Sequence, residues 1–187
     1  MESRTQAVGD IEMRWEEAGE GFPLVLIHGI PTCPALWRSV IPLINGARCL
    51  AWEMVGYGAS IPQGRDRDIS VRRQAGYLLS WMDAIGVERA VLAGHDLGGG
   101  VVQIAAVREP GRCAGMFLTN SIGYDSWPIP SVKTMRTAGA TASTTPGMPG
   151  ASPSSAAAGS SASRWTTPAR CWGWWTAGTT RAARCMT

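Results

Sequence analysis

Short apolar segments alternate with amphipathic segments between residues 23 and 118, and this pattern predicts strands that alternate with helices. The continuous apolar run PLVLI at 23–27 is typical of a strand buried on both faces. Shorter apolar runs predict three further strands, at 48–52, 90–93 and 113–118. Strands and helices that alternate at this spacing form right-handed βαβ units. We therefore predict an α/β fold with a mostly parallel sheet and flanking helices.

Apolar residues at helical spacing place the helices. The clearest amphipathic helix is predicted over 69–85, with Ser70 as its N-cap and Gly86 as its stop. Helical spacing also occurs over 36–44, and again after Gly100. Ahead of this region, alternating apolar and polar residues on both sides of a Gly-Asp turn predict a hairpin over 1–20.

The segment 90–101, AVLAGHDLGGGV, has the pattern of a strand that turns sharply into a helix around one reactive side chain. The central residue of such a turn is strained, so the residues two positions away must be nearly free of side chain. Gly94, Gly98 and Gly99 meet this requirement around Asp96. We expect His95, which flanks Asp96, to point away from the turn and to pack.

His28 and Asp96 each follow a predicted parallel strand. Because the carboxyl ends of parallel strands meet at one edge of the sheet, we predict a site there that includes both residues. An alternative interpretation is that Asp96 only caps the following helix, since acids at helix N-termini are stabilising. A phosphate loop fits poorly, because the segment lacks GxGxxG and GK[ST] and its acid would repel phosphate.

Composition divides the chain into two unlike parts. Every one of the 14 Asp and Glu residues lies at or before Asp125. The segment 133–187 has basic residues but no acid, and no Leu, Ile, Val, Phe or Tyr. We predict a folded part over 1–132 and a low-complexity, disordered tail over 133–187, which cannot bury enough apolar surface to fold. Translation of a GC-rich gene out of frame from about residue 133 is our preferred explanation of the tail.

The remaining composition narrows the class of protein. The net charge of +3 averages two unlike segments, so it does not point to nucleic acid. No apolar run reaches about eighteen residues and no secretory leader is evident, so we expect a cytoplasmic protein that does not associate with membranes. Five scattered cysteines without CxxC predict reduced thiols and no metal site. We expect no cofactor, and the sequence leaves the oligomeric state open.

Three motifs resemble the amino-terminal half of an α/β-hydrolase, in the branch of epoxide hydrolases and haloalkane or haloacetate dehalogenases. They are His28-Gly29-Ile30-Pro31, similar to the HGxP oxyanion motif; 56–60 (GYGAS), similar to the GYGxS loop; and 94–99 (GHDLGG), similar to the nucleophile elbow. Each stands at the end of a predicted strand, in the order that the family has. The resemblance implies the α/β-hydrolase fold and a small-molecule substrate, either an epoxide or an organohalide.

The resemblance implies that Asp96 attacks an sp3 carbon and forms an alkyl-enzyme ester. A carboxylate is already ionised at neutral pH, so this step needs no base. The backbone N–H groups of Ile30 and Leu97 would stabilise the oxyanion when the ester is hydrolysed. Pro31 would hold the loop that presents the Ile30 amide, and His28 would brace this loop.

The sequence also departs from the family. The family's acid–base histidine and its acid partner come late in the chain, whereas the histidines here are His28 and His95. Asp125 is a substitute candidate for the acid. The cap domain and the last strands also have no counterpart, so we expect a truncated fold of impaired activity.

Three functions stay open. Ile30 and Leu97 offer no side-chain donor for a halide, which favours epoxide hydrolysis over dehalogenation. The missing histidine keeps open a third possibility, an inactive or non-catalytic α/β-hydrolase-like protein. Trp37, Trp52 and Trp81 are expected in the core or in a pocket wall.

Overall fold

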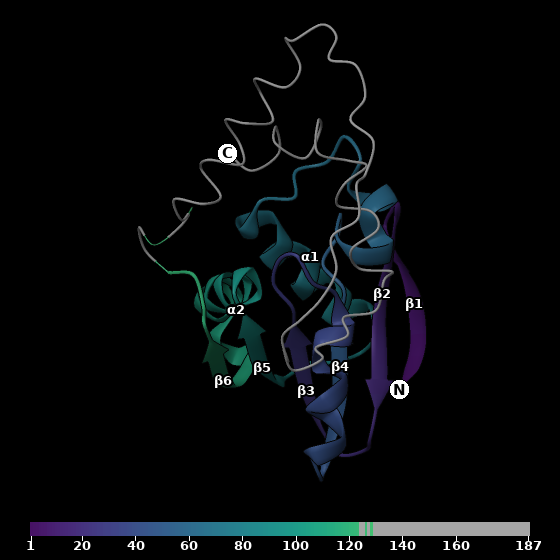
Figure 1. Cartoon of the computed structure of the whole chain (residues 1–187), viewed down its shortest axis with the longest axis vertical. Helices are drawn as coiled ribbons and strands as arrows, with labels where there is room; N and C mark the ends of the chain where they lie inside the picture. Colours follow the sequence, from purple (N-terminus) through teal and green to yellow (C-terminus); the bar gives the residue numbers. More distant parts are fainter. Residues whose placement is uncertain (124–125, 127, 129–187) are drawn as a thin grey trace, which may run out of the picture.

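The computed structural model describes residues 1–123, 126 and 128, and these form one six-stranded sheet with helices on both faces (Figure 1). The strands are β1 (Glu2–Val8), β2 (Ile11–Ala18), β3 (Phe22–Ile27), β4 (Ala47–Trp52), β5 (Ala90–His95) and β6 (Cys113–Thr119). Asp125 and the predicted tail over 133–187 lie outside the described residues.

The sheet is mostly parallel, in the order β1-β2-β4-β3-β5-β6. Strands β4, β3, β5 and β6 are parallel, whereas β1 pairs antiparallel with β2 and β2 pairs antiparallel with β4. The α/β class, the four predicted parallel strands and the amino-terminal hairpin are therefore confirmed. The hairpin joins the same sheet, with β2 beside β4. The alternation of apolar and polar residues in the sequence did not predict this pairing.

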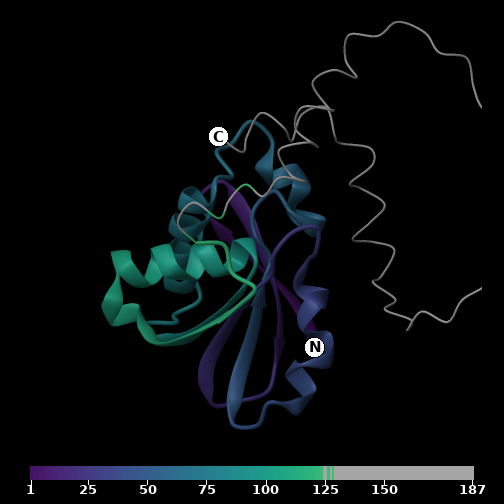
Figure 2. The same cartoon turned by 60° about the vertical axis from the view of Figure 1, so that its left-hand side comes forward.

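Two α-helices cover one face of the sheet, and two short 3-10 helices cover the other (Figure 2). The α-helices are α1 (Val71–Ala84) and α2 (Leu97–Arg108), and the two 3-10 helices are η1 (Pro34–Ser39) and η2 (Ile41–Leu43). Two further 3-10 helices, η3 (Gly58–Gly64) and η4 (Pro110–Arg112), lie in connections. The helical spacing seen over 36–44 falls on these two 3-10 helices and not on one continuous helix, because Pro42 has no N–H to continue a helix from η1.

Side chains of β3 alternate between two apolar clusters. Val25 and Ile27 pack in the larger cluster with α1 and α2, whereas Leu26 packs in the smaller cluster against η1. All three side chains are at most 2% exposed, as predicted for a strand buried on both faces. The predicted burial of tryptophans is also confirmed, because Trp52 and Trp81 lie in the larger cluster and Trp37 in the smaller.

The ends of α1 follow the sequence signals. The Ser70 side chain accepts a hydrogen bond from the backbone N–H of Arg73, at 3.3 Å, which satisfies one of the free amides of the first turn. After the helix, Gly86 has φ 69°, a conformation that suits glycine because it has no Cβ. The helix is therefore held at both ends by local chemistry.

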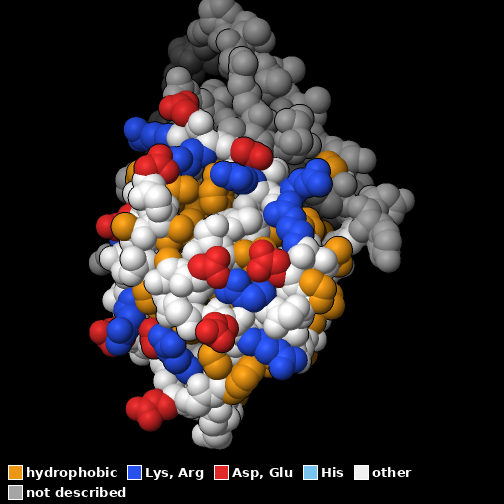
Figure 3. All heavy atoms as spheres, turned by 180° about the vertical axis from the view of Figure 1, so that it is seen from behind, with side chains coloured by type: hydrophobic (Ala, Val, Ile, Leu, Met, Phe, Trp, Pro, Cys, Tyr) orange, Lys and Arg blue, Asp and Glu red, His pale blue; other side chains and the backbone are white. Residues whose placement is uncertain are grey.

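The surface charges, the helix hydropathy and the cysteines do not indicate a particular partner. Acidic and basic side chains are interspersed on the face drawn in Figure 3. No helix in the described part of the chain has the length and hydropathy needed to cross a bilayer. Among the described cysteines, Cys49 and Cys113 are free thiols.

Loss of the α1 cap has a measurable cost. Ser70→Ala is expected to lower the free energy of unfolding by about 1 kcal/mol, because the Arg73 amide loses its acceptor. Urea unfolding followed by circular dichroism measures the difference. Ser80→Ala is the matched control, since Ser80 is exposed within the same helix and alanine favours helix. Equal effects of the two substitutions would contradict the capping role.

Candidate active site

Asp96 lies in the sharp turn between β5 and α2. Its backbone angles, φ of 53° and ψ of −118°, are values that residues other than glycine rarely adopt. The surrounding backbone holds this conformation. The Asp96 N–H donates to the Thr119 carbonyl at 3.3 Å, and the Asp96 carbonyl accepts from the amides of Gly99 and Ile122 at 3.1 and 3.2 Å. Such a strained residue, held by its neighbours, marks a candidate functional site.

The glycines around Asp96 are needed because other backbone segments come very close. A Cβ at Gly98 would overlap the carbonyl oxygens of Ile27 and His28, at the end of β3. A Cβ at Gly94 would overlap the backbone at Gly98, and one at Gly99 would overlap the Ser121 side chain. The turn therefore has no room for side chains at the positions where the sequence has glycine.

The structure brings the ends of β3 and β5 together at Asp96. The backbone N–H of Ile30 donates to Oδ2 of the Asp96 carboxylate at 2.9 Å. A Cβ at Gly29 would lie only 2.6 Å from this same oxygen, so glycine permits the approach. The His28–Pro31 segment thus presents an amide directly to the carboxylate.

A second source of positive potential comes from α2. Leu97 is the first residue of this helix, and the first amides of a helix have no acceptor within it. The positive end of the helix dipole also lies beside Asp96. The Asp96 side chain makes no capping hydrogen bond to α2, so the alternative that it only caps this helix is not supported, and the Ile30 amide is the donor that faces its carboxylate.

His28 is fully buried and connects two loops. Its Nε2 accepts from the backbone N–H of Met54 at 3.2 Å, and its Nδ1 lies 2.9 Å from the Gly29 carbonyl oxygen. The two bonds together require the tautomer with its hydrogen on Nδ1. Burial lowers the pKa of His28 to about 4, so the ring is neutral at pH 7. His28 therefore joins the loop after β3 to the loop after β4, and it has no ring nitrogen free for proton transfer.

The other predicted site residues have less direct roles in the geometry. Pro31 follows a cis peptide bond, and Thr32 closes the turn by donating from its N–H and its hydroxyl to the Gly29 carbonyl. His95 is half-buried, and its Nδ1 has no hydrogen-bond partner in the described part of the chain. Asp125 lies outside the described residues.

Glu53 is a buried polar residue that the sequence reasoning missed. Its Oε1 accepts from the Ser60 hydroxyl at 2.8 Å, and a Cβ at Gly58 would overlap its Oε2. Burial raises the pKa of Glu53, against the lowering effect of the Ser60 hydrogen bond. Glu53 therefore holds the 56–60 loop from inside. The signal was present, since Glu53 is a single acid within the otherwise apolar stretch LAWEMV that leads into the GYGAS loop.

Gln103 was missed as well. Its Nε2 lies 2.9 Å from both the Ser121 hydroxyl and the Ile122 carbonyl, and 3.2 Å from the Gly99 carbonyl. These bonds hold the segment after β6 against the first turn of α2. Because Ile122 also donates to the Asp96 carbonyl, Gln103 supports the turn itself. Its signal in the sequence is a single amide within the apolar run VVQIAA.

Asp96 does not line either of two shallow cavities in the described part of the chain, one beyond the end of α1 and one over α1 and α2. One cavity is lined by Asp83, Gly86, Val87, Glu88 and Arg112, and the other by Arg72, Gln103, Ile104, Val107 and Arg108. Within the described residues, no group of three or more His, Cys, Asp or Glu side chains is placed to hold a metal ion. The candidate site is thus built from one carboxylate and backbone amides.

A strand–turn–helix elbow on a mostly parallel sheet, with a backbone amide facing the central residue, is the arrangement of the α/β-hydrolases. The family model for the alpha/beta hydrolase fold matches residues 23–148 of this chain. The chain therefore belongs to the α/β-hydrolase fold family.

Similar proteins differ in the chemistry that their names state. The chain is 36% identical over 126 residues to 2-hydroxymuconate semialdehyde hydrolase of Pseudomonas sp. (strain CF600), covering 64% of this chain and 43% of that protein. It is 34% identical over 99 residues to epoxide hydrolase B of Mycobacterium tuberculosis, covering 52% and 28%. A solved haloalkane dehalogenase from Bradyrhizobium elkani USDA94 superposes with a TM-score of 0.63 at 26% identity, covering 78% and 51%. The chain thus spans less than half of both curated relatives.

The buried His28 predicts a specific pH dependence. Because its pKa is lower in the folded protein, the folded state binds fewer protons than the unfolded chain between pH 6.5 and about 4. Stability is therefore lost as the pH falls through this window, by about 3 kcal/mol from this group alone. His28→Gln keeps an acceptor but cannot titrate. Urea unfolding from pH 4 to 8 should show the stability advantage of the wild type over this variant shrinking toward pH 4. A constant difference would contradict the burial of a neutral ring.

The close approach at Gly98 predicts a large effect of one methyl group. Gly98→Ala is expected to lower the free energy of unfolding by about 2 kcal/mol or more, because backbone carbonyls cannot move aside as side chains do. Gly111→Ala is the matched control, since a Cβ there meets nothing within 4 Å. It should leave stability unchanged or raise it slightly. Thermal unfolding of both variants decides the point, and an unaffected Gly98→Ala protein would rule out this packing.

Proposed function

We propose that the protein is an α/β-fold hydrolase in which Asp96 is the nucleophile, attacking an sp3 carbon of a small epoxide to form an alkyl-enzyme ester. The observation that supports this most is the hydrogen bond from the Ile30 amide to Oδ2 of Asp96. It orients the carboxylate so that one oxygen is held while the other remains for attack.

In the first step, the free oxygen of Asp96 forms a bond to carbon, and the carbon–oxygen bond of the epoxide breaks. The electron pair of that bond moves to the epoxide oxygen, which takes up a proton from a solvent water molecule. Attack by a carboxylate removes no proton from the nucleophile, so this step needs no base. The start of α2 and the Ile30 amide position the nucleophile for this step.

In the second step, water attacks the ester carbonyl and an oxyanion develops on the oxygen beside Ile30. The N–H groups of Ile30 and Leu97 are the groups that would stabilise it, as in an oxyanion hole. Water needs a base to become a nucleophile. His28 cannot act as this base, because both of its ring nitrogens are engaged and it is fully buried. We therefore expect the ester to accumulate on this chain.

A second candidate is hydrolysis of a carbon–halogen bond, and the similarity to a solved haloalkane dehalogenase supports it. The same attack by Asp96 would release a halide in place of an alkoxide. The side chains of Ile30 and Leu97 carry no donor that could hold this halide, which favours the epoxide. A non-catalytic protein is the third candidate, because the sequence contains no histidine beyond His95.

Covalent labelling tests the proposal directly. Incubation with 1,2-epoxyhexane, and separately with 1-bromohexane, is expected to add about one alkyl group per chain, on Asp96. Intact-mass and peptide mass spectrometry locate the adduct, and the relative rates of the two probes distinguish the first two candidates. Asp96→Asn should abolish the adduct.

Asp66→Asn is the matched control, because Asp66 also has a positive φ, at 57°, but lies outside the elbow. This variant should be labelled like the wild type. Labelling that persists in Asp96→Asn would overturn the assignment of the nucleophile. Steady release of product beyond one equivalent would overturn the expectation that the ester accumulates. No labelling by either probe would favour the non-catalytic candidate.

A further inference from the structure

Two residues with left-handed backbone conformations lie side by side at the carboxyl ends of β5 and β6. In the described part of the chain, the residues other than glycine with a positive φ are Asp66, Asp96 and Asn120. Asn120, with φ 47°, is the first residue after β6, and His95 pairs with Thr119 in the register of β5 and β6. Asn120 therefore stands beside Asp96. Such backbone conformations cluster at functional sites, and asparagine tolerates this one better than most residues do.

The segment that follows β6 wraps around the backbone of Asp96. The Asp96 N–H donates to the Thr119 carbonyl, and the Asp96 carbonyl accepts from the Ile122 amide. Asn120 and Ser121 are the residues between these two bonds. The Ser121 side chain contacts the first turn of α2, whereas the Asn120 side chain is exposed. The two bonds thus fix the position of Asn120 relative to Asp96, and both join described residues.

The hydroxyl groups near this end of the sheet are used by the fold. Those of Thr32, Ser60 and Ser121 each donate to a carbonyl or carboxylate oxygen at 2.8 Å. The Asn120 side chain, in contrast, makes no hydrogen bond within the part of the chain that the structure describes. An asparagine amide carries two donors on Nδ2. These donors are therefore available to a small molecule bound at Asp96.

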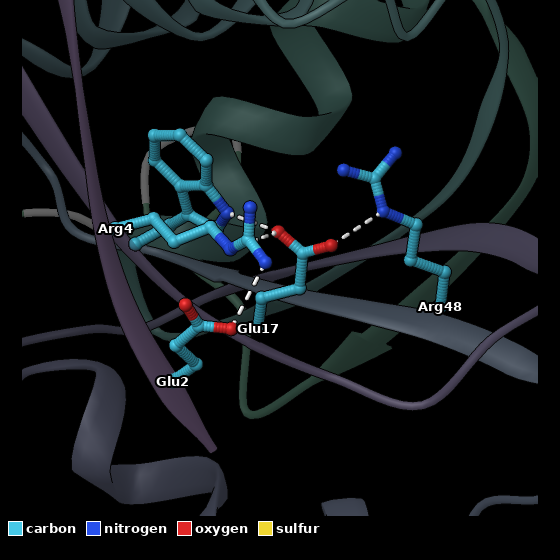
Figure 4. Close-up of polar contacts among 5 residues, drawn as sticks. Glu2, Arg4, Glu17 and Arg48 are labelled. Atoms are coloured by element: carbon cyan, nitrogen blue, oxygen red, sulfur yellow. Dashed lines mark hydrogen bonds and ion pairs between the residues drawn. The ribbon is translucent and has the colours of Figure 1, made fainter.

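Charged side chains at the other end of the sheet show the usual structural use of polar groups. Glu17 accepts from Arg48 at 2.7 Å and pairs with Arg4 at 3.3 Å, and Arg4 also pairs with Glu2 (Figure 4). This ion-pair cluster joins the amino-terminal hairpin to the start of β4. Its charges therefore serve the fold, whereas Asn120 has no such partner among the described residues.

The proposed reaction leaves one charge without a donor. When Asp96 attacks carbon, negative charge develops on the epoxide oxygen. The Ile30 amide is already bonded to Oδ2 of Asp96, and the side chains of Ile30 and Leu97 carry no donor. A donor beside the nucleophile would stabilise the charge on the departing oxygen, because donors are most effective where charge develops in the transition state.

We propose that Asn120 is a substrate-binding residue whose Nδ2–H donates a hydrogen bond to the epoxide oxygen as the ring opens. The inference rests on the proposed function, since it takes Asp96 as the nucleophile. The amide gives up no proton. The electron pair of the broken carbon–oxygen bond moves to the oxygen, the hydrogen bond stabilises this charge, and a solvent water supplies the proton and leaves as hydroxide. The substrate is then an epoxide whose oxygen reaches the end of β6 while its carbon faces Asp96.

Two variants of Asn120 test this hydrogen bond. Asn120→Gly removes the amide and keeps the backbone conformation, because glycine adopts a positive φ freely. Asn120→Asp keeps the shape of the side chain but replaces the donor by a carboxylate, which only accepts. Each variant is incubated with 1,2-epoxyhexane, and the rate of adduct formation on Asp96 is followed by intact-mass and peptide mass spectrometry. Far-UV circular dichroism establishes that each variant is folded.

Labelling by 1,2-epoxyhexane should slow at least about tenfold in both variants, since loss of one preorganised oxyanion donor costs roughly 10²–10³ in rate. Labelling of Asn120→Gly by 1-bromohexane should slow less, because bromide is a better leaving group than an alkoxide and depends less on a donor. Asp66→Gly is the matched control, since Asp66 is also exposed with a positive φ, at 57°, but lies outside the elbow. It should leave both rates unchanged.

The outcomes distinguish this inference from the proposed function. A wild type that is labelled on Asp96, with Asn120→Gly labelled by the epoxide at the same rate, would overturn the role of Asn120 and leave the nucleophile in place. Equal losses with the two probes would overturn it too, because a displaced Asp96 would slow both reactions alike. A wild type that neither probe labels would overturn the nucleophile and the role of Asn120 together.

Discussion

The close approach of two backbone segments at Gly98 is the constraint on which the candidate site depends. The carbonyl groups of Ile27 and His28, at the end of β3, lie where a Cβ at Gly98 would be. This contact lets the first turn of α2 sit directly against the neighbouring strand. As a result, the Ile30 amide reaches the carboxylate of Asp96, which lies 66 positions further along the chain. A single methyl group at Gly98 would separate the two halves of the site.

Buried and half-buried polar side chains keep these segments in place. His28 joins the loops after β3 and β4, Glu53 holds the loop that follows β4, and Gln103 holds the segment after β6. Each makes the hydrogen bonds that a buried polar group needs, since an unpaired one costs free energy. Gln74 acts in the same way, bonding both the N–H and the carbonyl of Val55. The rigidity of the site thus comes from side chains that do not themselves touch the Asp96 carboxylate.

The two edges of the sheet show how the same fold treats strands differently. Strand β1 has alternating polar residues and an ion-pair cluster, and it ends the sheet on one side. Strand β6 lies beside buried β5 in the sheet and has the composition of an interior strand, yet it stands at the other end of the described sheet. From composition alone, β6 cannot be distinguished from its neighbouring strands. The apolar residues of a strand show that it can be buried, but they do not show whether another strand pairs with it.

The sequence by itself determined the elements and the place of the candidate nucleophile, Asp96. Period-two and period-3.6 patterns depend on local geometry, so 23–27, the capped helix after Ser70 and the glycine-flanked Asp96 were all recognisable. The tertiary structure decided which groups meet. The bond from Ile30 to Asp96 joins residues 66 positions apart, and the pairing of the hairpin with β4 was likewise invisible to periodicity. Glu53 and Gln103 looked like ordinary polar residues, because their partners become neighbours only when the chain has folded. Local patterns encode the elements, whereas contacts between distant segments exist only in the packed molecule.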